Sequence, residues 1–372
     1  MPFTGREMRT LITDDGVLTL SLETVTVAEP GDDQVVVAIE AAPINPSDLG
    51  LMLAAADVGT LKAAEGGALK FSVPQQRLGS LRGRLGDSLA IGNEGAGTVV
   101  RAGRNVAHLE GRKVGMIGGG MYADYRLIEA NSIVPLPEGA SAADGASMFV
   151  NPLTALGFVE TARREGHGAL VHTAAASNLG QMLQKICLAD GIPLVNIVRS
   201  KVQEDILRQI GAEHVVDTSE ENFRDKLAEA LEKTGATIAF DAIGGGTLGS
   251  DILRAMERAA VRNAGGYSRY GSDTFKQLYI YGALDTSPAV LDRLSFGFQW
   301  SAGGWLLFPM LGRFGKETVE AMRSRVVTEL TTTFASSYTR TIGLAEALQP
   351  DTLRAYERKS TGEKFLIDPT LG

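Results

Sequence analysis

The middle of the chain alternates short apolar runs with longer stretches whose apolar residues recur at helical spacing. Residues 169–173, 193–198 and 214–216 are runs of strand length. Between the first two, apolar residues recur every three or four positions, at Leu179, Met182, Leu183, Ile186 and Cys187. This order predicts a βαβαβ unit whose two helices end at Gly191 and Gly211.

The turn between the first strand and its helix consists of small residues, Ala174–Asn178. In such units the first turn directs main-chain N–H groups at the diphosphate of a dinucleotide. Gly180 alone keeps a glycine of the usual G-x-G-x-x-G turn, so we expect it to allow close packing and Asn178 to adopt a left-handed backbone. The alternative is an ordinary turn without a ligand. The residues predicted to bind the diphosphate are Ala175, Ala176, Ser177, Asn178, Leu179 and Gly180.

The alternation of helices and strands continues to about residue 315. Further helices are predicted at 202–210, at 223–231 and from Ser250, and further strands at 237–243, 278–284 and 304–308. Parallel strands joined by helices form a doubly wound sheet. We therefore expect a Rossmann-type α/β domain over residues 146–315.

Residues 1–145 differ, because short β-like runs such as 16–27 and 34–41 are separated by Gly and Pro. This pattern predicts a partly open β-barrel. The stretch 53–90 is rich in Gly, Ala, Ser and basic residues, and is interpreted as a solvated surface loop or a lid. The tail predicts helices at 316–330 and 344–355 and a last strand at 364–367. A final strand indicates that residues 316–372 return to complete the first domain.

Charge and cysteine content exclude several classes of function. The net charge of −8 over 372 residues argues against a general nucleic-acid or anionic-membrane surface. The apolar stretch Trp305–Leu311 is too short to span a bilayer. One cysteine and no apolar signal region favour a reducing, cytoplasmic compartment. Cys187 is interpreted as a core residue and His172 as a satisfied sheet residue, and the four histidines show no spacing typical of a metal site.

Several segments carry motifs in a characteristic order: AAPINPSDL (41–49), IGNEGAGTVVRAGRNV (91–106), GGGMYADYRLIEANSIVPLPEGAS (118–141), NPLTAL (151–156) and TGEKFLIDP (361–369). Together they resemble the zinc-independent medium-chain dehydrogenases/reductases of the quinone oxidoreductase and enoyl reductase branch. The resemblance implies that the first domain is GroES-like. Where zinc enzymes of this superfamily carry cysteine and histidine, this chain has Asn45-Pro46-Ser47 and Asn93, consistent with a metal-free enzyme.

The second strand of the βαβαβ unit is followed by basic residues. NAD enzymes usually have an acid here for the ribose 2′-hydroxyl, and NADP enzymes have a cation for the 2′-phosphate. Val198 is followed by Arg199, Ser200 and Lys201, and the first acid is Glu204. A guanidinium can bind a phosphate through paired, charge-assisted hydrogen bonds. These residues therefore predict NADPH as the cofactor, the alternative being a solvated basic loop.

The resemblance also suggests which residues face the reacting groups. It places Asn45 and Thr154 near the nicotinamide and the acceptor, and Gly244 and Gly245 near the nicotinamide ribose. Tyr122 is a candidate proton donor, with a packing role as the alternative. Asn151 followed by proline equally fits a helix N-cap with proline at the first helical position.

These observations favour an NADPH-dependent reductase that transfers hydride to a quinone, an enone or a similar activated acceptor without zinc. Without a Lewis acid to polarise an alcohol, the substrate should accept hydride readily. One alternative is a 2-enoyl thioester reductase, and another is a nucleotide-binding protein that has lost turnover. The resemblance further implies a homodimer, in which the predicted strand 304–308 supplies the sheet edge.

Overall fold

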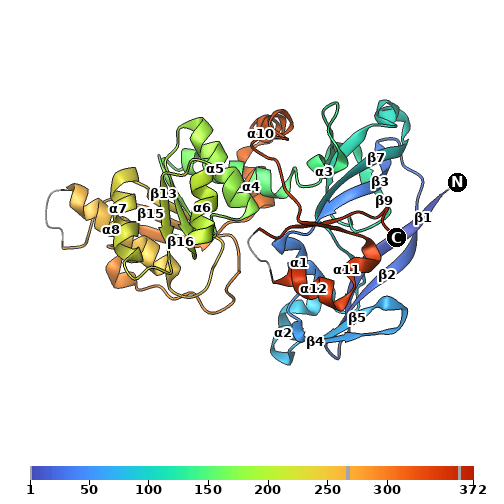
Figure 1. Ribbon diagram of the computed structural model, residues 1–372, viewed down its shortest axis with the longest axis horizontal. Helices are drawn as coiled ribbons and strands as arrows, with labels where there is room; N and C mark the ends of the chain where they lie inside the picture. Colours follow the sequence, from blue (N-terminus) through green and yellow to red (C-terminus); the bar gives the residue numbers. More distant parts are fainter. Residues whose placement is uncertain (1, 265–268, 359–361) are drawn as a thin grey trace. The chain divides into compact units, whose positions relative to one another are not determined.

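The computed structural model describes residues 2–264, 269–358 and 362–372, which form two compact units (Figure 1). Unit 1 contains Met1–Val150 and Val327–Gly372, and unit 2 contains Asn151–Val326. The chain thus leaves unit 1 after residue 150 and re-enters it at 327, whereas the sequence analysis expected these passages at 145 and 315. Thr361, the first residue of the last motif, lies outside the described residues.

Unit 2 is built on a six-stranded parallel sheet with the order β13-β12-β11-β14-β15-β16. The chain starts at a central strand and adds strands first to one side and then to the other, which confirms the predicted doubly wound, Rossmann-type topology. The strands are β11 (Leu170–His172), β12 (Leu194–Val198), β13 (His214–Asp217), β14 (Ile238–Asp241), β15 (Lys276–Ile280) and β16 (Trp300–Gly304). The connecting helices are α5 (Asn178–Asp190), α6 (Lys201–Gln209), α7 (Phe223–Thr234) and α8 (Leu248–Ala264).

The helical periodicity of α5 is confirmed. Its predicted apolar face is buried, including Cys187. The helix ends at Gly191, whose φ of 65° is left-handed, a conformation that glycine adopts without strain. One core of unit 2 combines strand residues such as Val171 and Val195 with α7 and α8 residues such as Leu231 and Ile252.

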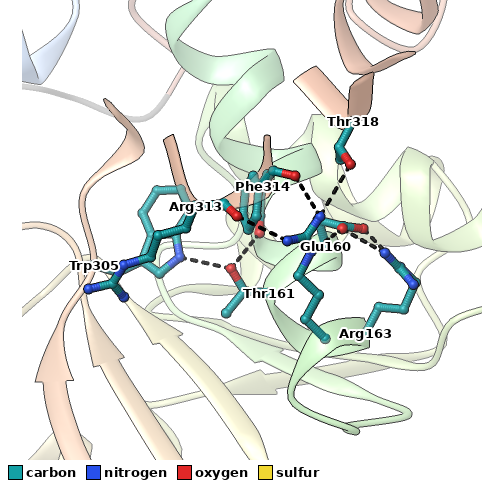
Figure 2. A network of polar contacts seen from close by, with 9 residues as sticks. Glu160, Thr161, Arg163, Trp305, Arg313, Phe314 and Thr318 are labelled. Atoms are coloured by element: carbon teal, nitrogen blue, oxygen red, sulfur yellow. Dashed lines mark hydrogen bonds and ion pairs between the residues drawn. The ribbon is translucent and has the colours of Figure 1, made fainter. Parts of the chain in front are cut away.

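Two strands of unit 2 lie elsewhere than predicted. β15 begins at Lys276 rather than residue 278, and β16 covers 300–304, so the predicted strand 304–308 is wrong. Trp305 is instead buried against α4 (Val150–Arg164), where its indole N–H donates to the Thr161 hydroxyl at 3.0 Å (Figure 2). The helix α9 (Leu307–Phe314) follows at once. The apolar run therefore marks a side chain entering the core and an amphipathic helix, not a strand.

Unit 1 consists of two sheets around a common core. One has the order β4-β5-β2-β1-β6, and the other has the path β10-β8-β7-β3-β18-β17 with β9 also paired to β3. Their strands are β1 (Phe3–Ile12), β2 (Val17–Val27), β3 (Gln34–Pro43), β4 (Asp57–Ala63), β5 (Leu69–Ser72), β6 (Leu89–Ala90), β7 (Glu94–Ala102), β8 (Lys113–Ile117), β9 (Tyr125–Glu129), β10 (Ile133–Pro135), β17 (Arg340–Ile342) and β18 (Phe365–Ile367).

The tail of the chain returns to unit 1 as predicted. β18 pairs antiparallel with β3, the strand that leads toward Asn45. Before it, α10 (Lys316–Thr328) matches the helix predicted at 316–330. The single helix predicted at 344–355 is instead two, α11 (Leu344–Ala347) and α12 (Pro350–Glu357). Pro350 begins the second helix, because proline suits the first turn of a helix but not its interior.

The interpretation of 53–90 as a solvated loop is wrong. The segment contains β4, β5, the helix α2 (Gln75–Leu81) and β6. β5 pairs with β2, and Leu69, Phe71 and Leu78 are buried in the core of unit 1. Only the alternation Leu69-Lys70-Phe71 marked a half-buried strand, and it is too short to stand out among the surrounding Gly and Ala.

Candidate cofactor and active site

The turn that follows β11 is built around a helix cap. The Ser177 hydroxyl accepts the N–H of Gly180 at 3.2 Å, which makes Ser177 the N-cap of α5. Asn178 is then the first helical residue, so the expectation that it adopts a left-handed backbone is wrong. Ala174 adopts that conformation instead, with a φ of 50°. The left-handed residue therefore lies at the start of the turn, close to β11, and not at the start of α5.

Gly180 is required at its position by close packing. A Cβ atom there would lie 2.2 Å from the carbonyl oxygen of Ala175, so no larger residue fits without a backbone shift. The predicted diphosphate-binding residues 175–180 thus comprise the end of the turn after β11 and the first residues of α5. At this place the positive end of the α5 helix dipole favours an anion.

A threonine and an aspartate shape the neighbouring turn. Thr173 follows β11, and its hydroxyl donates to Asp241 Oδ1 at 2.7 Å and accepts the N–H of Ala242 at 2.8 Å. Asp241 also accepts the N–H groups of Ile243 and Gly244, at 2.9 and 3.1 Å. Both side chains are buried. The role of Thr173 was missed by the sequence analysis, although a polar residue at the end of a buried strand was a usable signal.

Gly244 and Gly245 pack against the loop that follows β15. A Cβ atom on Gly244 would lie 2.6 Å from the carbonyl oxygen of Gly282, and one on Gly245 would lie 2.7 Å from Asp285 and from Ser287. Gly244 also has a left-handed φ of 81°. These glycines therefore allow two loops to approach each other, and their closeness to a nicotinamide ribose stays a prediction.

The three residues expected at the 2′-phosphate lie together after β12 but differ in their bonding. Arg199 is exposed, and its main-chain N–H donates to Gln203 Oε1 at 3.0 Å. Ser200 is the N-cap of α6. Lys201 is exposed and forms ion pairs with Glu204 at 3.2 Å and Asp205 at 3.0 Å. The positive charge of Lys201 is thus already balanced by two nearby carboxylates. Arg199 is therefore the stronger candidate for binding a phosphate.

In unit 1, Asn45 belongs to a buried polar network. It is the N-cap of α1 (Pro46–Met52), its main-chain N–H donates to Asp48 Oδ2 at 2.8 Å, and its Nδ2 donates to Glu94 Oε1 at 2.8 Å. Asp48 Oδ1 accepts the main-chain N–H of Asn93 at 2.7 Å. Burial raises the pKa of Asp48 to about 7, although the hydrogen bonds from the main chain of Asn45 and Asn93 oppose the rise.

Glu94 connects this network to the start of α4. Its Oε2 accepts the N–H groups of Phe149 and Val150, both at 2.9 Å. The helix begins at Val150, so the interpretation of Asn151 as an N-cap with proline at the first helical position is wrong. A side chain distant in sequence supplies the cap, which no local pattern could indicate. Thr154 is buried on the same helix, in unit 2.

Tyr122 is fully buried, which favours its packing alternative. Its hydroxyl donates to the carbonyl oxygen of Pro43 at 3.0 Å, and its ring lies against Gly92, where a Cβ would be 2.6 Å away. Burial, and then the negative charge of Asp48, raise the pKa of this phenol well above its usual value. Proton donation by Tyr122 stays a prediction, and it requires the bond to Pro43 to break.

Lys364, which the sequence analysis did not single out, lies beside the same network. It precedes β18, and its ammonium group donates to the Ser147 hydroxyl at 2.7 Å. Burial lowers its pKa to about 8, while Glu94 and Asp48 act in the opposite direction. Unit 1 thus holds a half-buried lysine close to two fully buried acids.

The histidine and the cysteine singled out by the sequence analysis are both buried, and burial shifts the pKa of each toward the uncharged form. His172 is fully buried in β11, with its Nε2 2.7 Å from the Tyr281 hydroxyl, and burial lowers its pKa to about 3. Burial raises the pKa of Cys187 to about 12. Within residues 2–264, 269–358 and 362–372, no group of three His, Cys, Asp or Glu side chains could hold a metal ion. No helix in the described part of the chain is long and apolar enough to cross a membrane.

Residues 31–138 match the alcohol dehydrogenase GroES-like domain family. A solved structure of a Mesorhizobium loti protein assigned as an NADPH:quinone reductase superposes with a TM-score of 0.73, at 26% identity and 99% coverage of both chains. The mitochondrial enoyl-[acyl-carrier-protein] reductase of Xenopus tropicalis is 29% identical over 69% of this chain and 69% of its own length. A quinone oxidoreductase of Pseudomonas aeruginosa is 27% identical over 41% of this chain and 49% of its own length.

Proposed function

We propose that the chain is a zinc-independent, quinone oxidoreductase-like medium-chain dehydrogenase/reductase and acts as an NADPH-dependent reductase of quinones or similar activated acceptors, as its similarity to such proteins supports. The observation that carries the proposal is the likeness over 99% of the chain to the Mesorhizobium loti protein. The structure is consistent with the proposal, because the small-residue turn follows β11, Arg199 follows β12, and these two strands are parallel neighbours.

NADPH would supply the hydride, and the chain would supply binding and orientation. We propose that residues 175–180 bind the diphosphate and that Arg199, aided by Ser200, binds the 2′-phosphate. Gly244 and Gly245 are proposed near the nicotinamide ribose. Asn45 and Thr154 are the proposed catalytic residues, and Tyr122 remains a candidate proton donor.

Activity measurements separate this proposal from its rivals. The purified protein is mixed with NADPH and either a panel of quinones or a panel of 2-enoyl-CoA esters, and loss of NADPH absorbance is followed. We expect turnover with quinones. Turnover with enoyl esters alone would favour the second candidate, which the similarity to the frog enzyme supports. A change in NADPH fluorescence without consumption would indicate a binding protein and contradict both enzymatic functions.

We also propose a cytoplasmic homodimer. The single cysteine, Cys187, is consistent with a reducing compartment. The corrected sheet edge is β16, where an unpaired strand can extend the sheet into a second copy. Leu306 and Phe308 follow this edge and are 63% and 59% exposed, which supplies apolar contact area. Light scattering should show a dimer at micromolar concentration, and a monomer would contradict the assignment.

A further inference from the structure

Glu94 receives three N–H groups from two segments distant in sequence. Its Oε1 accepts from the Asn45 side chain at 2.8 Å, and its Oε2 accepts from the main chain of Phe149 and Val150, both at 2.9 Å. The side chain is completely buried. One carboxylate thus holds the residue that caps α1 and, at the same time, the first turn of α4.

This arrangement suits the ionised carboxylate. All three partners donate, and a carboxylate is an acceptor only, whereas a protonated acid would bring a further donor into the same space. Burial raises the pKa of Glu94, but the three N–H groups and the positive charge of Lys364 oppose that rise. The half-buried lysine therefore supplies the counter-charge that a buried carboxylate needs.

We propose that Glu94 is a positioning residue for hydride transfer, which fixes Asn45 and the start of the helix that carries Thr154, with the half-buried Lys364 as its counter-charge. The inference rests on the proposed function, because Asn45 and Thr154 are its proposed catalytic residues. Small misplacements of such groups reduce turnover strongly even when the ligand still binds. Glu94 itself is not required to touch substrate or cofactor.

Because Lys364 can lose its charge, the positioning of Asn45 and of the start of α4 by Glu94 should depend on pH. Its pKa of about 8 means that its positive charge is lost as the pH rises above that value, after which Glu94 keeps its three N–H donors but no longer has this positive charge nearby. The other titratable groups that interact with the cluster are Asp48, Tyr122, Tyr338, Tyr356 and Asp144. The tyrosines have pKa values raised above 10, and Asp48 titrates near 7, so a fall in kcat above pH 8 is assigned to Lys364.

The test is Glu94→Gln, because glutamine keeps the shape but replaces one acceptor by an amide donor that faces N–H groups. We expect kcat with a quinone to fall at least about tenfold while the Kd for NADPH stays within about twofold of the wild type. Circular dichroism checks the fold. The matched control is Glu40→Gln on β3, a half-exposed carboxylate paired with Lys113 at 2.6 Å, which should leave both constants unchanged.

Lys364→Arg provides a second, independent readout, because a guanidinium stays charged over the whole range. The wild-type fall in kcat above pH 8 should disappear in this variant, and it decides the matter if Glu94→Gln does not fold. The inference is overturned if Glu94→Gln keeps full kcat, if kcat and NADPH binding fall together, or if Lys364→Arg leaves the pH profile unchanged. A wild type that binds NADPH but reduces no acceptor defeats the proposed function first, and the inference falls with it.

Discussion

At the scale of single residues, buried polar side chains in both units are matched to specific main-chain partners. Thr173 and Asp241 form one such set in unit 2, and Asn45, Asp48 and Glu94 form another in unit 1. Burying a polar group without a partner costs about 1–3 kcal/mol, so these sets constrain the turns around them. The proposed site residues therefore stand on turns whose shape is determined by hydrogen bonds.

Arg199 gives the sharpest prediction at this scale. Replacing it with alanine should weaken NADPH binding by about tenfold or more and change NADH binding little, because only NADPH carries the 2′-phosphate that a guanidinium can bind in a paired manner. Calorimetric titration with both nucleotides measures this difference.

Lys201→Ala is the matched control for this prediction. It also removes one exposed cation after β12, but a cation that is already paired with Glu204 and Asp205. A smaller effect on NADPH binding is expected. Equal losses of NADPH and NADH affinity in Arg199→Ala would defeat the assignment of the 2′-phosphate site.

Sequence predicted the close packing at the small-residue turn but could not predict the backbone conformations of its residues. Gly180 was correctly expected to allow close packing, whereas the left-handed residue is Ala174 and not Asn178. The reason is the cap formed by Ser177, which depends on where the helix begins. Glu94 shows the wider limit, since its partners at 149 and 150 are more than fifty residues away along the chain.

At the scale of elements, Arg164 of α4 binds the end of α9 through hydrogen bonds. The Arg164 guanidinium donates to the carbonyl oxygens of Arg313 at 3.1 Å and Phe314 at 2.8 Å, in the last turn of α9. It also donates to the Thr318 hydroxyl at 3.2 Å and lies 5.1 Å from the centre of the Phe314 ring. Carbonyl groups in the last turn of a helix lack partners within the helix, so an arginine satisfies them well.

Arg164→Ala should therefore lower the free energy of unfolding by about 1–3 kcal/mol, because it leaves these carbonyl groups without their donor. Urea unfolding measures the change. The control is Arg163→Ala, because Arg163 is 67% exposed and pairs with Glu160 on the surface, where an ion pair contributes at most about 1 kcal/mol. Equal losses in the two variants would show that Arg164 does not fasten α9.

Hydrophobic periodicity predicted the elements with a strong repeat and failed where burial had another cause. α5 and α10 lie close to their predicted limits, because one face of each carries the expected spacing. The run at 304–308 was taken for a strand, yet Trp305 packs on Gly157 of α4, where a Cβ would be 2.9 Å from the indole ring. Conversely, β16 itself reads Trp-Ser-Ala-Gly-Gly and has no apolar alternation to reveal it.

At the scale of the whole molecule, chain connectivity decides which segments form each unit. The tail crosses back to unit 1, where β18 pairs with β3 and Lys364 joins the cluster around Glu94. This return was predictable from a chain that ends on a strand. The convergence of residues 45, 94, 147–150 and 364 was not, because only the resemblance of separate motifs, and no local pattern, linked these segments.

The central claim is that a turn of small residues, with one glycine, binds the diphosphate of NADPH as glycine-rich turns do in related folds. Isothermal titration calorimetry of the wild-type protein with NADPH and NADH tests it most directly. The account predicts one NADPH bound per chain, more tightly than NADH. No measurable heat of binding with either nucleotide, at concentrations up to the millimolar range, would contradict the account.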